Sequence, residues 1–234
     1  MRQKPIPPAL TPFLEGKVLL IDKPLQWTSF DMVKKVRWLT KIMKVGHAGT
    51  LDPLATGLLI ICTGKFTKQI NDYMGMTKEY IGSLVLGATT ASYDLEQEPE
   101  NFKSIDVITE ASIQTATRQF IGTIFQMPPQ HSAIKKDGKR LYESARQGIE
   151  VKVDPRQITI EQFEITKIDL PTVEFRVVCS TGTYIRSLVH DFGQALGVGA
   201  YMSSLRRTKI GEFHVENAIQ WEELEKEIND LLEG

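Results

Sequence analysis

The hydrophobic and polar positions along this 234-residue chain follow two periods, which together predict both strands and helices. Continuous or alternating apolar stretches predict strands over 16–22, 78–87, 124–127, 151–153, 156–168, 173–179 and 206–213. Helical spacing predicts helices over 28–41, 66–73, 105–121, 141–147, 184–196 and 220–232. Residues 54–63 fit either a helical turn leading into a strand or a strand throughout. This order predicts an α+β fold with a mixed, mostly antiparallel central sheet flanked by helices.

Two helix starts carry a capping signal. Thr28 or Ser29 is expected to cap the helix that runs to about residue 41, because hydroxyl side chains accept hydrogen bonds from the first turn. Residues 180–183, with two threonines and a serine, are expected to cap the helix that ends near Leu196.

Charge is unevenly distributed along the chain. The net charge is −1, but residues 94–110 carry −5 and residues 216–234 carry −6, which leaves +10 on the remainder. The positive residues fall into four clusters: Lys34, Lys35, Arg37, Lys41 and Lys44; Lys65 and Lys68; Lys135, Lys136, Lys139 and Arg140; and Arg206, Arg207 and Lys209. Four such clusters near glycine-rich loops favour a basic face for a nucleic-acid backbone.

Composition narrows the class of protein. A hydrophobic content of 41% and a charged content of 24% are typical of globular proteins. The N-terminal residues lack the apolar core of a signal peptide, and no apolar run approaches the length of a membrane span. Cys62 and Cys179 lie in apolar stretches, so we expect buried thiols in a reducing cytoplasm rather than a disulfide.

One loop stands out as candidate chemistry. Asp52 is the only carboxylate between Asp31 and Asp72, and it precedes Pro53 among three glycines, at positions 46, 49 and 57. An aspartate before proline often starts a turn, and the glycines can supply positive φ angles, so a structural turn and a reactive carboxylate both remain open. The spacing fits neither a phosphate-binding loop nor a zinc site, and the loop lacks the second carboxylate of a glycosidase.

The residues of this loop resemble the signature of the TruB-type pseudouridine synthases, in the short bacterial form, which isomerise the T-loop uridine of tRNA at position 55. The loop that carries the resemblance reads Gly46-His-Ala-Gly-Thr-Leu-Asp-Pro-Leu-Ala-Thr-Gly57. Further motifs follow in the family's order: Leu20-Ile-Asp-Lys-Pro24, Lys78-Glu-Tyr80, Pro128-Pro129, Ser132-Ala-Ile-Lys135, Leu141-Tyr-Glu-Ser-Ala-Arg-Gln-Gly148, Cys179-Ser-Thr-Gly-Thr-Tyr-Ile-Arg186 and Leu205-Arg-Arg207.

The resemblance implies roles for particular residues. Asp52 matches the catalytic aspartate, Arg186 the arginine that pairs with it, and Tyr80 the tyrosine that stacks on the target base. The remaining matches are substrate-binding positions: His47, Tyr184, Leu205, Lys23 and Lys68. Taken alone, a tyrosine at the start of a strand is more typical of a core. Asp94 is a secondary candidate, although its loop lacks the glycine expected soon after it, and His131 stands where an aromatic residue is commoner.

The resemblance also implies the organisation and partners of the protein. It predicts an N-terminal arm over 1–15, a catalytic domain over 16–215 with a thumb-like insert at about 125–150, and an acidic C-terminal helix over 216–234 without a full PUA domain. It implies the T-arm of tRNA as substrate, no cofactor and no metal, no guide RNA, no membrane, and a cytoplasmic monomer. Two alternatives remain: a non-catalytic tRNA-binding or folding protein on the same scaffold, and a nucleic-acid glycosidase.

Overall fold

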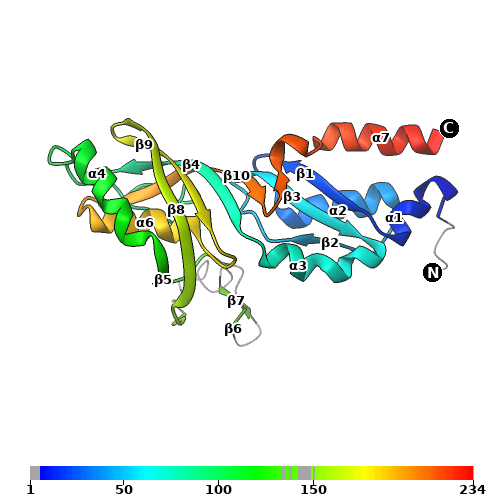
Figure 1. The fold of residues 1–234 in the computed structure, drawn as a ribbon, viewed down its shortest axis with the longest axis horizontal. Helices are drawn as coiled ribbons and strands as arrows, with labels where there is room; N and C mark the ends of the chain where they lie inside the picture. The colour runs from blue at the N-terminus through cyan, green and yellow to red at the C-terminus, as the bar shows by residue number, and fades with distance from the viewer. Residues whose placement is uncertain (1–5, 133–134, 137–138, 142–148, 150, 234) are drawn as a thin grey trace. The chain divides into compact units, whose positions relative to one another are not determined.

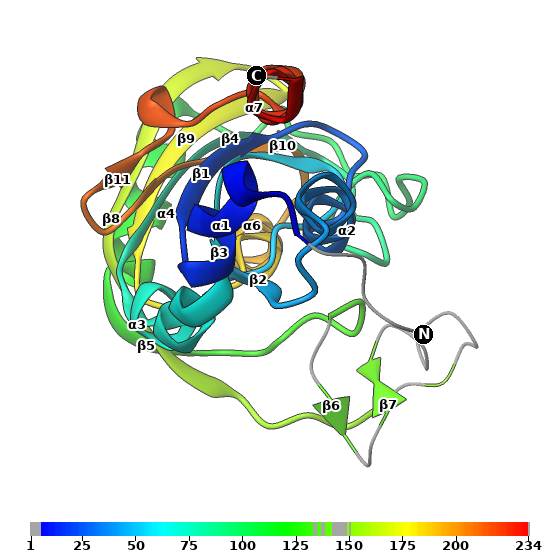
Figure 2. The ribbon, with the colours of Figure 1, turned by 90° about the vertical axis from the view of Figure 1, so that its right-hand side faces the viewer.

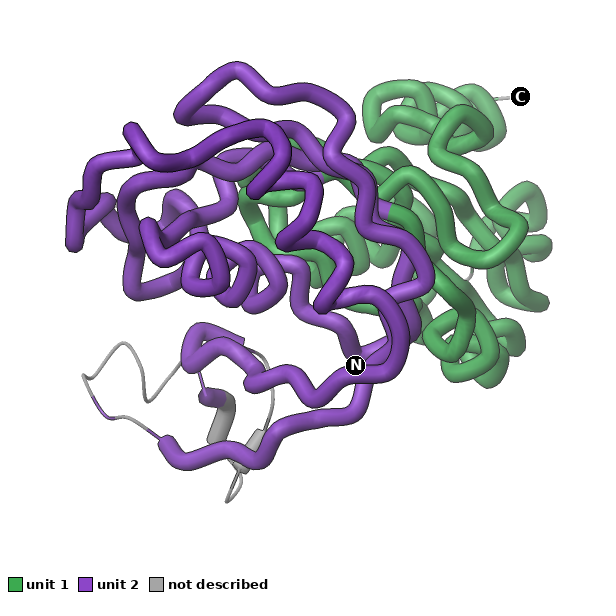
Figure 3. Tube along the Cα trace, turned by 60° about the vertical axis from the view of Figure 1, so that its left-hand side comes forward, with its two compact units in different colours: residues 1–79, 206–234 green, residues 80–205 purple. Residues whose placement is uncertain are grey.

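The computed structural model describes residues 6–132, 135–136, 139–141, 149 and 151–233. They form two compact units, which Figure 3 shows in different colours. Unit 1 comprises residues 1–79 and 206–234, and unit 2 comprises residues 80–205. Two strands, β4 (Lys78–Leu86) and β10 (Ala200–Ile210), pass from one unit into the other. The chain therefore leaves unit 1 once and returns to it once.

Unit 1 is built on β3 (Ala55–Thr63), whose residues are almost all buried. This strand pairs antiparallel with β1 (Val18–Lys23) and with β2 (Val45–Ala48), and in the order of the sheet β10 is its other neighbour. A short strand, β11 (Phe213–His214), pairs antiparallel with β10. The helical elements of unit 1 (Figures 1 and 2) are η1 (Pro8–Leu10), α1 (Thr11–Glu15), α2 (Ser29–Thr40), η2 (Gly64–Gln69), α3 (Ile70–Gly75), η4 (Val215–Asn217) and α7 (Trp221–Glu233).

The two ends of the chain share one core in unit 1. Trp221 and Ile228 of α7 pack in the same hydrophobic cluster as Leu10, Phe13 and Ile21, all nearly inaccessible to solvent. The acidic residues of α7 therefore belong to an amphipathic helix whose apolar side is buried.

Unit 2 continues a sheet in the order β10, β4, β9, β8 and β5. The pairs β8–β9 and β5–β8 are antiparallel. Four phenylalanines pack in its core, in three T-shaped pairs and one tilted pair: Phe120, Phe163, Phe175 and Phe192. The elements of unit 2 not yet bounded are α4 (Glu110–Thr117), η3 (Arg118–Phe120), β5 (Gly122–Gln126), β6 (Lys135–Lys136), β7 (Lys139–Arg140), β8 (Arg156–Asp169), β9 (Thr172–Cys179) and α6 (Ile185–Ala195).

The predicted fold class is confirmed, since the sheet is mixed, mostly antiparallel and flanked by helices. Residues 55–63 are a strand, which resolves the ambiguity left by periodicity. Thr28 caps α2 with a capping box to Asp31, as predicted. The two cysteines are buried and free.

Several boundaries were predicted wrongly. Residues 45–48 form β2, residues 151–153 form no strand, and β10 begins six residues before the predicted position. The helix predicted from 105 begins only at Glu110, because Thr109 forms a capping box with Ser112. The predicted helix over 141–147 lies outside the described residues except for Leu141, and part of the thumb-like insert does so too.

The predicted N-terminal arm is partly helical. Within it, η1 and α1 follow one another, and Leu10 and Phe13 are buried in the core of unit 1. Proline at the first positions of each helical turn is compatible with this arrangement, because those positions need no N–H donor.

Candidate active site

The Asp52 loop connects β2 to β3 in unit 1, and hydrogen bonds hold its backbone on both sides of the aspartate. The buried hydroxyl of Ser29 accepts a hydrogen bond from the Leu51 N–H at 2.8 Å and donates one to the Leu51 carbonyl at 3.1 Å. The Ala55 N–H donates to the Asp52 carbonyl at 3.0 Å, and the Gln26 N–H donates to the Pro53 carbonyl at 2.8 Å. The loop is therefore a preformed turn that presents a partly exposed carboxylate.

The three glycines of the loop do different things. Gly49 and Gly57 have φ angles of 85° and 101°, which confirms the predicted need for positive φ at these two positions. A Cβ on Gly57 would also lie 2.3 Å from the Arg207 carbonyl oxygen. Gly46 has no positive φ; a Cβ there would lie 2.7 Å from the Ile70 Cδ1, so the position is small because of packing.

Arg207 is a structural part of this loop that sequence reasoning missed. It is 1% exposed; its Nε donates to the Leu58 carbonyl at 2.8 Å and its Nη2 donates to the Gly49 carbonyl at 3.2 Å. Its neighbour Arg206 binds both carboxylate oxygens of Asp22, at 2.6 and 2.9 Å. The cluster at 206–209, predicted as part of a basic face, therefore includes two arginines with partners inside unit 1.

Lys23 lies in the same electrostatic neighbourhood as Asp52. Its ammonium donates to the Pro24 carbonyl at 2.9 Å and to the Trp27 carbonyl at 2.6 Å, and the residue is inaccessible to solvent. Burial lowers the pKa of Lys23 to about 8, the Asp52 carboxylate opposes that shift, and the Arg207 guanidinium adds to it. The charges of Lys23 and Asp52 thus interact within unit 1, while the role of Lys23 in substrate binding stays a prediction.

His47 on β2 is partly buried. Burial lowers the pKa of its imidazole, a hydrogen bond to the Gly49 backbone opposes the shift, and the Arg207 guanidinium lowers the pKa further. Burial and the nearby guanidinium therefore both favour the neutral form of the ring. Lys68 is exposed on η2 and is not among the charges that shift the pKa of Lys23 or of His47.

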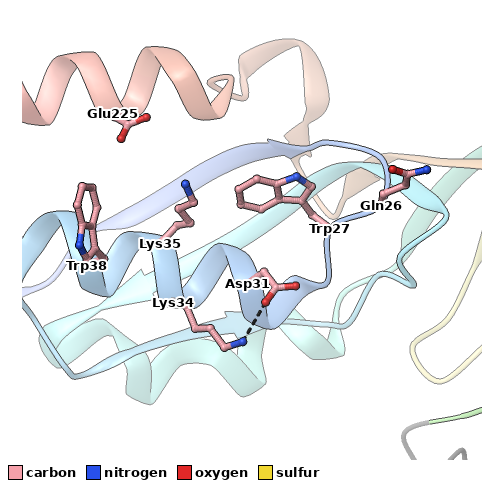
Figure 4. A pocket seen from close by; sticks show the side chains of 7 residues that line it. All are labelled: Gln26, Trp27, Asp31, Lys34, Lys35, Trp38 and Glu225. Atoms are coloured by element: carbon pink, nitrogen blue, oxygen red, sulfur yellow. Dashed lines mark hydrogen bonds and ion pairs between the residues drawn. The ribbon is translucent and has the colours of Figure 1, made fainter.

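A separate hollow of about 580 Å³ lies in unit 1 between α2 and α7 (Figure 4). Its lining consists of Gln26, Trp27, Asp31, Lys34, Lys35, Trp38 and Glu225. Two of its lysines already have partners there: Lys34 pairs with Asp31 at 3.0 Å, and the Lys35 ammonium lies 5.2 Å from the Trp27 ring centroid. None of the residues predicted for the active site lines this hollow.

Arg186 is a buried charged residue of unit 2. It lies in the first turn of α6, is 3% exposed, and its Nε lies 3.6 Å from the Asp94 carboxylate, which is equally buried. Its Nη1 donates to the Ser92 carbonyl at 3.2 Å, and its Nη2 donates to the His131 carbonyl at 2.9 Å. Asp94, a secondary candidate in the sequence, is thus the carboxylate that holds Arg186 within unit 2.

The start of α6 is fixed by β5 rather than by the predicted cap. The helix begins after Tyr184, which makes no side-chain capping bond, so the prediction that residues 180–183 cap it is wrong. Instead, the buried amide of Gln126 accepts from the Tyr184 N–H at 2.8 Å and donates to the Tyr184 carbonyl at 3.0 Å. The Ser187 hydroxyl donates to the Met127 carbonyl at 2.8 Å. These contacts position Tyr184 and Arg186 together.

Tyr80 and Leu205, the other predicted residues of unit 2, lie on the neighbouring strands β4 and β10, and each is 8% exposed. The predicted residues therefore divide between the units. Lys23, His47, Lys68 and Asp52 belong to unit 1, whereas Tyr80, Tyr184, Arg186 and Leu205 belong to unit 2. The pairing of Arg186 with Asp52 stays a prediction.

Within the described residues, no group of three or more histidine, cysteine or acidic side chains gathers as metal ligands would. In the same part of the chain, no helix is both long and apolar enough to cross a membrane.

Comparison with known families decides the family of this chain. Residues 37–185 match the model described as TruB family pseudouridylate synthase (N terminal domain). The chain belongs to the TruB family. Residues 186–231 match the model described as tRNA pseudouridylate synthase B C-terminal domain, so the two matches adjoin.

Individual relatives agree with this assignment. The chain is 56% identical over 214 residues to the tRNA pseudouridine synthase B of Flavobacterium johnsoniae, covering 88% of this chain and 93% of that protein. It is 48% identical over 227 residues to the protein of the same name from Parabacteroides distasonis, covering 94% and 95%.

Solved structures of more distant relatives share the fold. A chain in the crystal structure of a Cbf5-Nop10-Gar1 complex aligns with a TM-score of 0.71 and 30% identity, over 94% of this chain and 56% of its own length. A chain in the structure of an H/ACA RNP bound to a substrate RNA containing 2′-deoxyuridine aligns with a TM-score of 0.68 and 29% identity, over 92% and 53%. This TruB-family chain therefore spans little more than half the length of those chains.

Proposed function

We propose that the protein isomerises the uridine at position 55, in the T-loop of tRNA, to pseudouridine. Membership of the TruB family and the high identity to proteins named tRNA pseudouridine synthase B carry this proposal. The turn that presents the carboxylate of Asp52 supports it, because an aspartate held by its backbone neighbours is prepared to act without rearranging.

The reaction needs no external reactant. The bond between N1 of uracil and C1′ of ribose breaks, the base turns, and a bond forms between C5 and C1′. The proton that leaves C5 is matched by one gained at N1, so the product is an isomer and no electrons are transferred. We assign the catalytic role to the Asp52 carboxylate, which either attacks the sugar or the base, or removes the C2′ proton.

The other predicted residues complete the proposed site. We assign Arg186 to keep the Asp52 carboxylate ionised and aligned, since a guanidinium binds a carboxylate strongly. The target base must leave its stack at a cost of a few kcal/mol. The Tyr80 ring can return about 1–3 kcal/mol by stacking on it. Tyr184 and Leu205 would line the uracil pocket, and His47 and Lys68 would lie beside the flipped nucleotide. Lys23, which is buried, would act on the site through its charge, close to that of Asp52.

We further propose that the protein acts alone, as a cytoplasmic monomer that needs no guide RNA, cofactor or metal. Two buried, free cysteines suit a reducing compartment. The T-arm stem is then gripped through its phosphates by basic residues of this chain.

The decisive experiment incubates the protein with a T-arm stem-loop and compares wild type with Asp52→Asn. We expect wild type to convert the T-loop uridine, and Asp52→Asn to bind the RNA with unchanged affinity but lose turnover by about a thousand-fold or more. Conversion would be measured as the release of tritium from uridine labelled at C5, in an assay without added metal or guide RNA.

Other outcomes would identify the alternatives. Binding without conversion by wild type would indicate a tRNA-binding protein without catalysis, and release of free uracil would indicate a glycosidase. Turnover retained in Asp52→Asn would show that another group performs the chemistry.

A further inference from the structure

Three consecutive residues of one loop in unit 2 contact α6. The Ser92 carbonyl accepts from the Arg186 guanidinium at 3.2 Å, and the Asp94 carboxylate lies 3.6 Å from it. Tyr93, between them, stacks its ring on His190 with a centroid distance of 3.9 Å and an interplanar angle of 19°. His190 follows Arg186 by four residues on α6, so both side chains lie on the same side of the helix. The loop therefore holds Arg186 by two polar contacts and packs one ring on His190, one turn further along the same helix.

The backbone at Tyr93 is shaped for this arrangement. Tyr93 has a φ of 67°, in the left-handed region that residues other than glycine, asparagine and aspartate rarely adopt. Its carbonyl accepts from the Met202 N–H of β10 at 2.9 Å. The hydroxyls of Thr90 and Ser92 both donate to the Asp94 carbonyl, at 2.7 and 3.1 Å. These hydrogen bonds hold Tyr93 in a strained backbone conformation, and in that conformation its ring stacks on His190 of α6.

Close packing does not dictate the stack, since Tyr93 and His190 also line a cavity of about 470 Å³. A smaller side chain at either position would enlarge an existing cavity rather than open a void in the core. His190 is only partly buried, and its Nδ1 has no hydrogen-bond partner among the described residues. Its ring thus contributes through stacking rather than through a polar contact at that nitrogen.

We propose that Tyr93 and His190 are positioning residues, whose stacked rings fix α6 against the 92–94 loop and so set the place of the Arg186 guanidinium for the isomerisation. This inference rests on the proposed function and on the proposed role of Arg186. Small displacements of a group that aligns the reacting carboxylate lower the rate of the chemical step far more than they weaken RNA binding.

The test measures single-turnover rate, KM for the T-arm stem-loop and melting temperature for four variants. Tyr93→Asn keeps a side chain that tolerates positive φ but removes the stacking ring. We expect its rate to fall about tenfold with KM within twofold of wild type. His190→Gln, which suits a helix, should give the same loss, and the double variant should be no slower than either single variant. Tyr93→Phe keeps the ring and should react at the wild-type rate.

A matched control is Tyr73→Leu, which removes an aromatic pair with Phe213 in unit 1, at a centroid distance of 5.6 Å, and should leave the rate unchanged. A wild-type rate in Tyr93→Asn or in His190→Gln, with or without a lower melting temperature, would overturn the inference. Multiplicative losses in the double variant would also overturn it. Absence of turnover in wild type would instead overturn the proposed function, so the two failures are distinct.

Discussion

The two charged residues proposed to meet in catalysis are held in opposite ways. The Asp52 carboxylate of unit 1 is partly exposed, and the bonds around it are made by its backbone neighbours to Ser29 and Gln26. The Arg186 guanidinium of unit 2 is buried, and the guanidinium itself makes the contacts, to two carbonyls and the Asp94 carboxylate.

This difference fits the two proposed roles. A carboxylate that must act on a substrate can be held in place through the backbone of its neighbours. An arginine that must stay in one place is best supported through its own side chain. Removing one hydrogen bond of the backbone should therefore cost less free energy of unfolding than removing a partner of a buried charge.

The largest expected effect concerns the buried guanidinium of Arg186 and the free energy of unfolding. Arg186→Met leaves the Asp94 carboxylate buried without its ion pair, which should lower the free energy of unfolding by about 3–5 kcal/mol. Adding Asp94→Asn should recover part of this loss. The matched variant is Arg206→Met, which removes a guanidinium that is 36% exposed and leaves Asp22 with the Gln220 amide as a partner, so it should cost less than Arg186→Met. Urea unfolding measures all three, and equal losses from Arg186→Met and Arg206→Met would contradict the comparison.

The next effect concerns the hydrogen bonds that hold the backbone next to Asp52. Ser29→Ala removes both hydrogen bonds to Leu51, which should cost about 1–3 kcal/mol and lower kcat about tenfold because the Asp52 turn loosens. Thr40→Val is the control, since it removes a buried hydroxyl of the same helix that bonds Val36 and Ile42. It should lower stability while leaving kcat unchanged. A similar kcat in the two variants would show that the turn does not depend on Ser29.

The smallest effect concerns pH. Burial lowers the pKa of Lys23 to about 8 in the folded protein, against an ordinary value of 10.5, so between these pH values the unfolded chain binds more protons. The free energy of unfolding should therefore rise with pH from about 8 to about 10.5 through this group. Lys23→Met should flatten that rise in urea titrations at pH 7, 8, 9 and 10. A slope unchanged by the substitution would show that Lys23 does not titrate in this range.

Much of the fold and the Asp52 loop can be predicted from local sequence. The α2 cap, the strand at 78–86 and the turn around Asp52 depend on residues within a few positions of one another. β2 was missed because four residues with glycine in second place carry too little periodicity, although they pair with a mostly apolar strand. Here the long-range partner decides the conformation, not the local propensity.

The parts of the candidate site that escaped prediction rely on distant partners. Arg207 reads as one more cation in a basic cluster, and only its placement beside Gly49 and Leu58 makes it a support of the loop. Gln126 reads as an ordinary polar residue of a strand, yet it holds the Tyr184 backbone from 58 residues away. Residue type alone does not reveal such roles, because the same side chains are common on surfaces.

The shared core of the two chain ends has a consequence for the order of events during synthesis. Unit 2 is one continuous segment, whereas the core of unit 1 needs Trp221, Leu224 and Ile228 from the last helix. On a ribosome, residues 80–205 can therefore fold while the strand that follows Asp52 still waits for a helix not yet translated. Asp52, the proposed catalytic residue, would reach its final surroundings only when the residues of the last helix have been made.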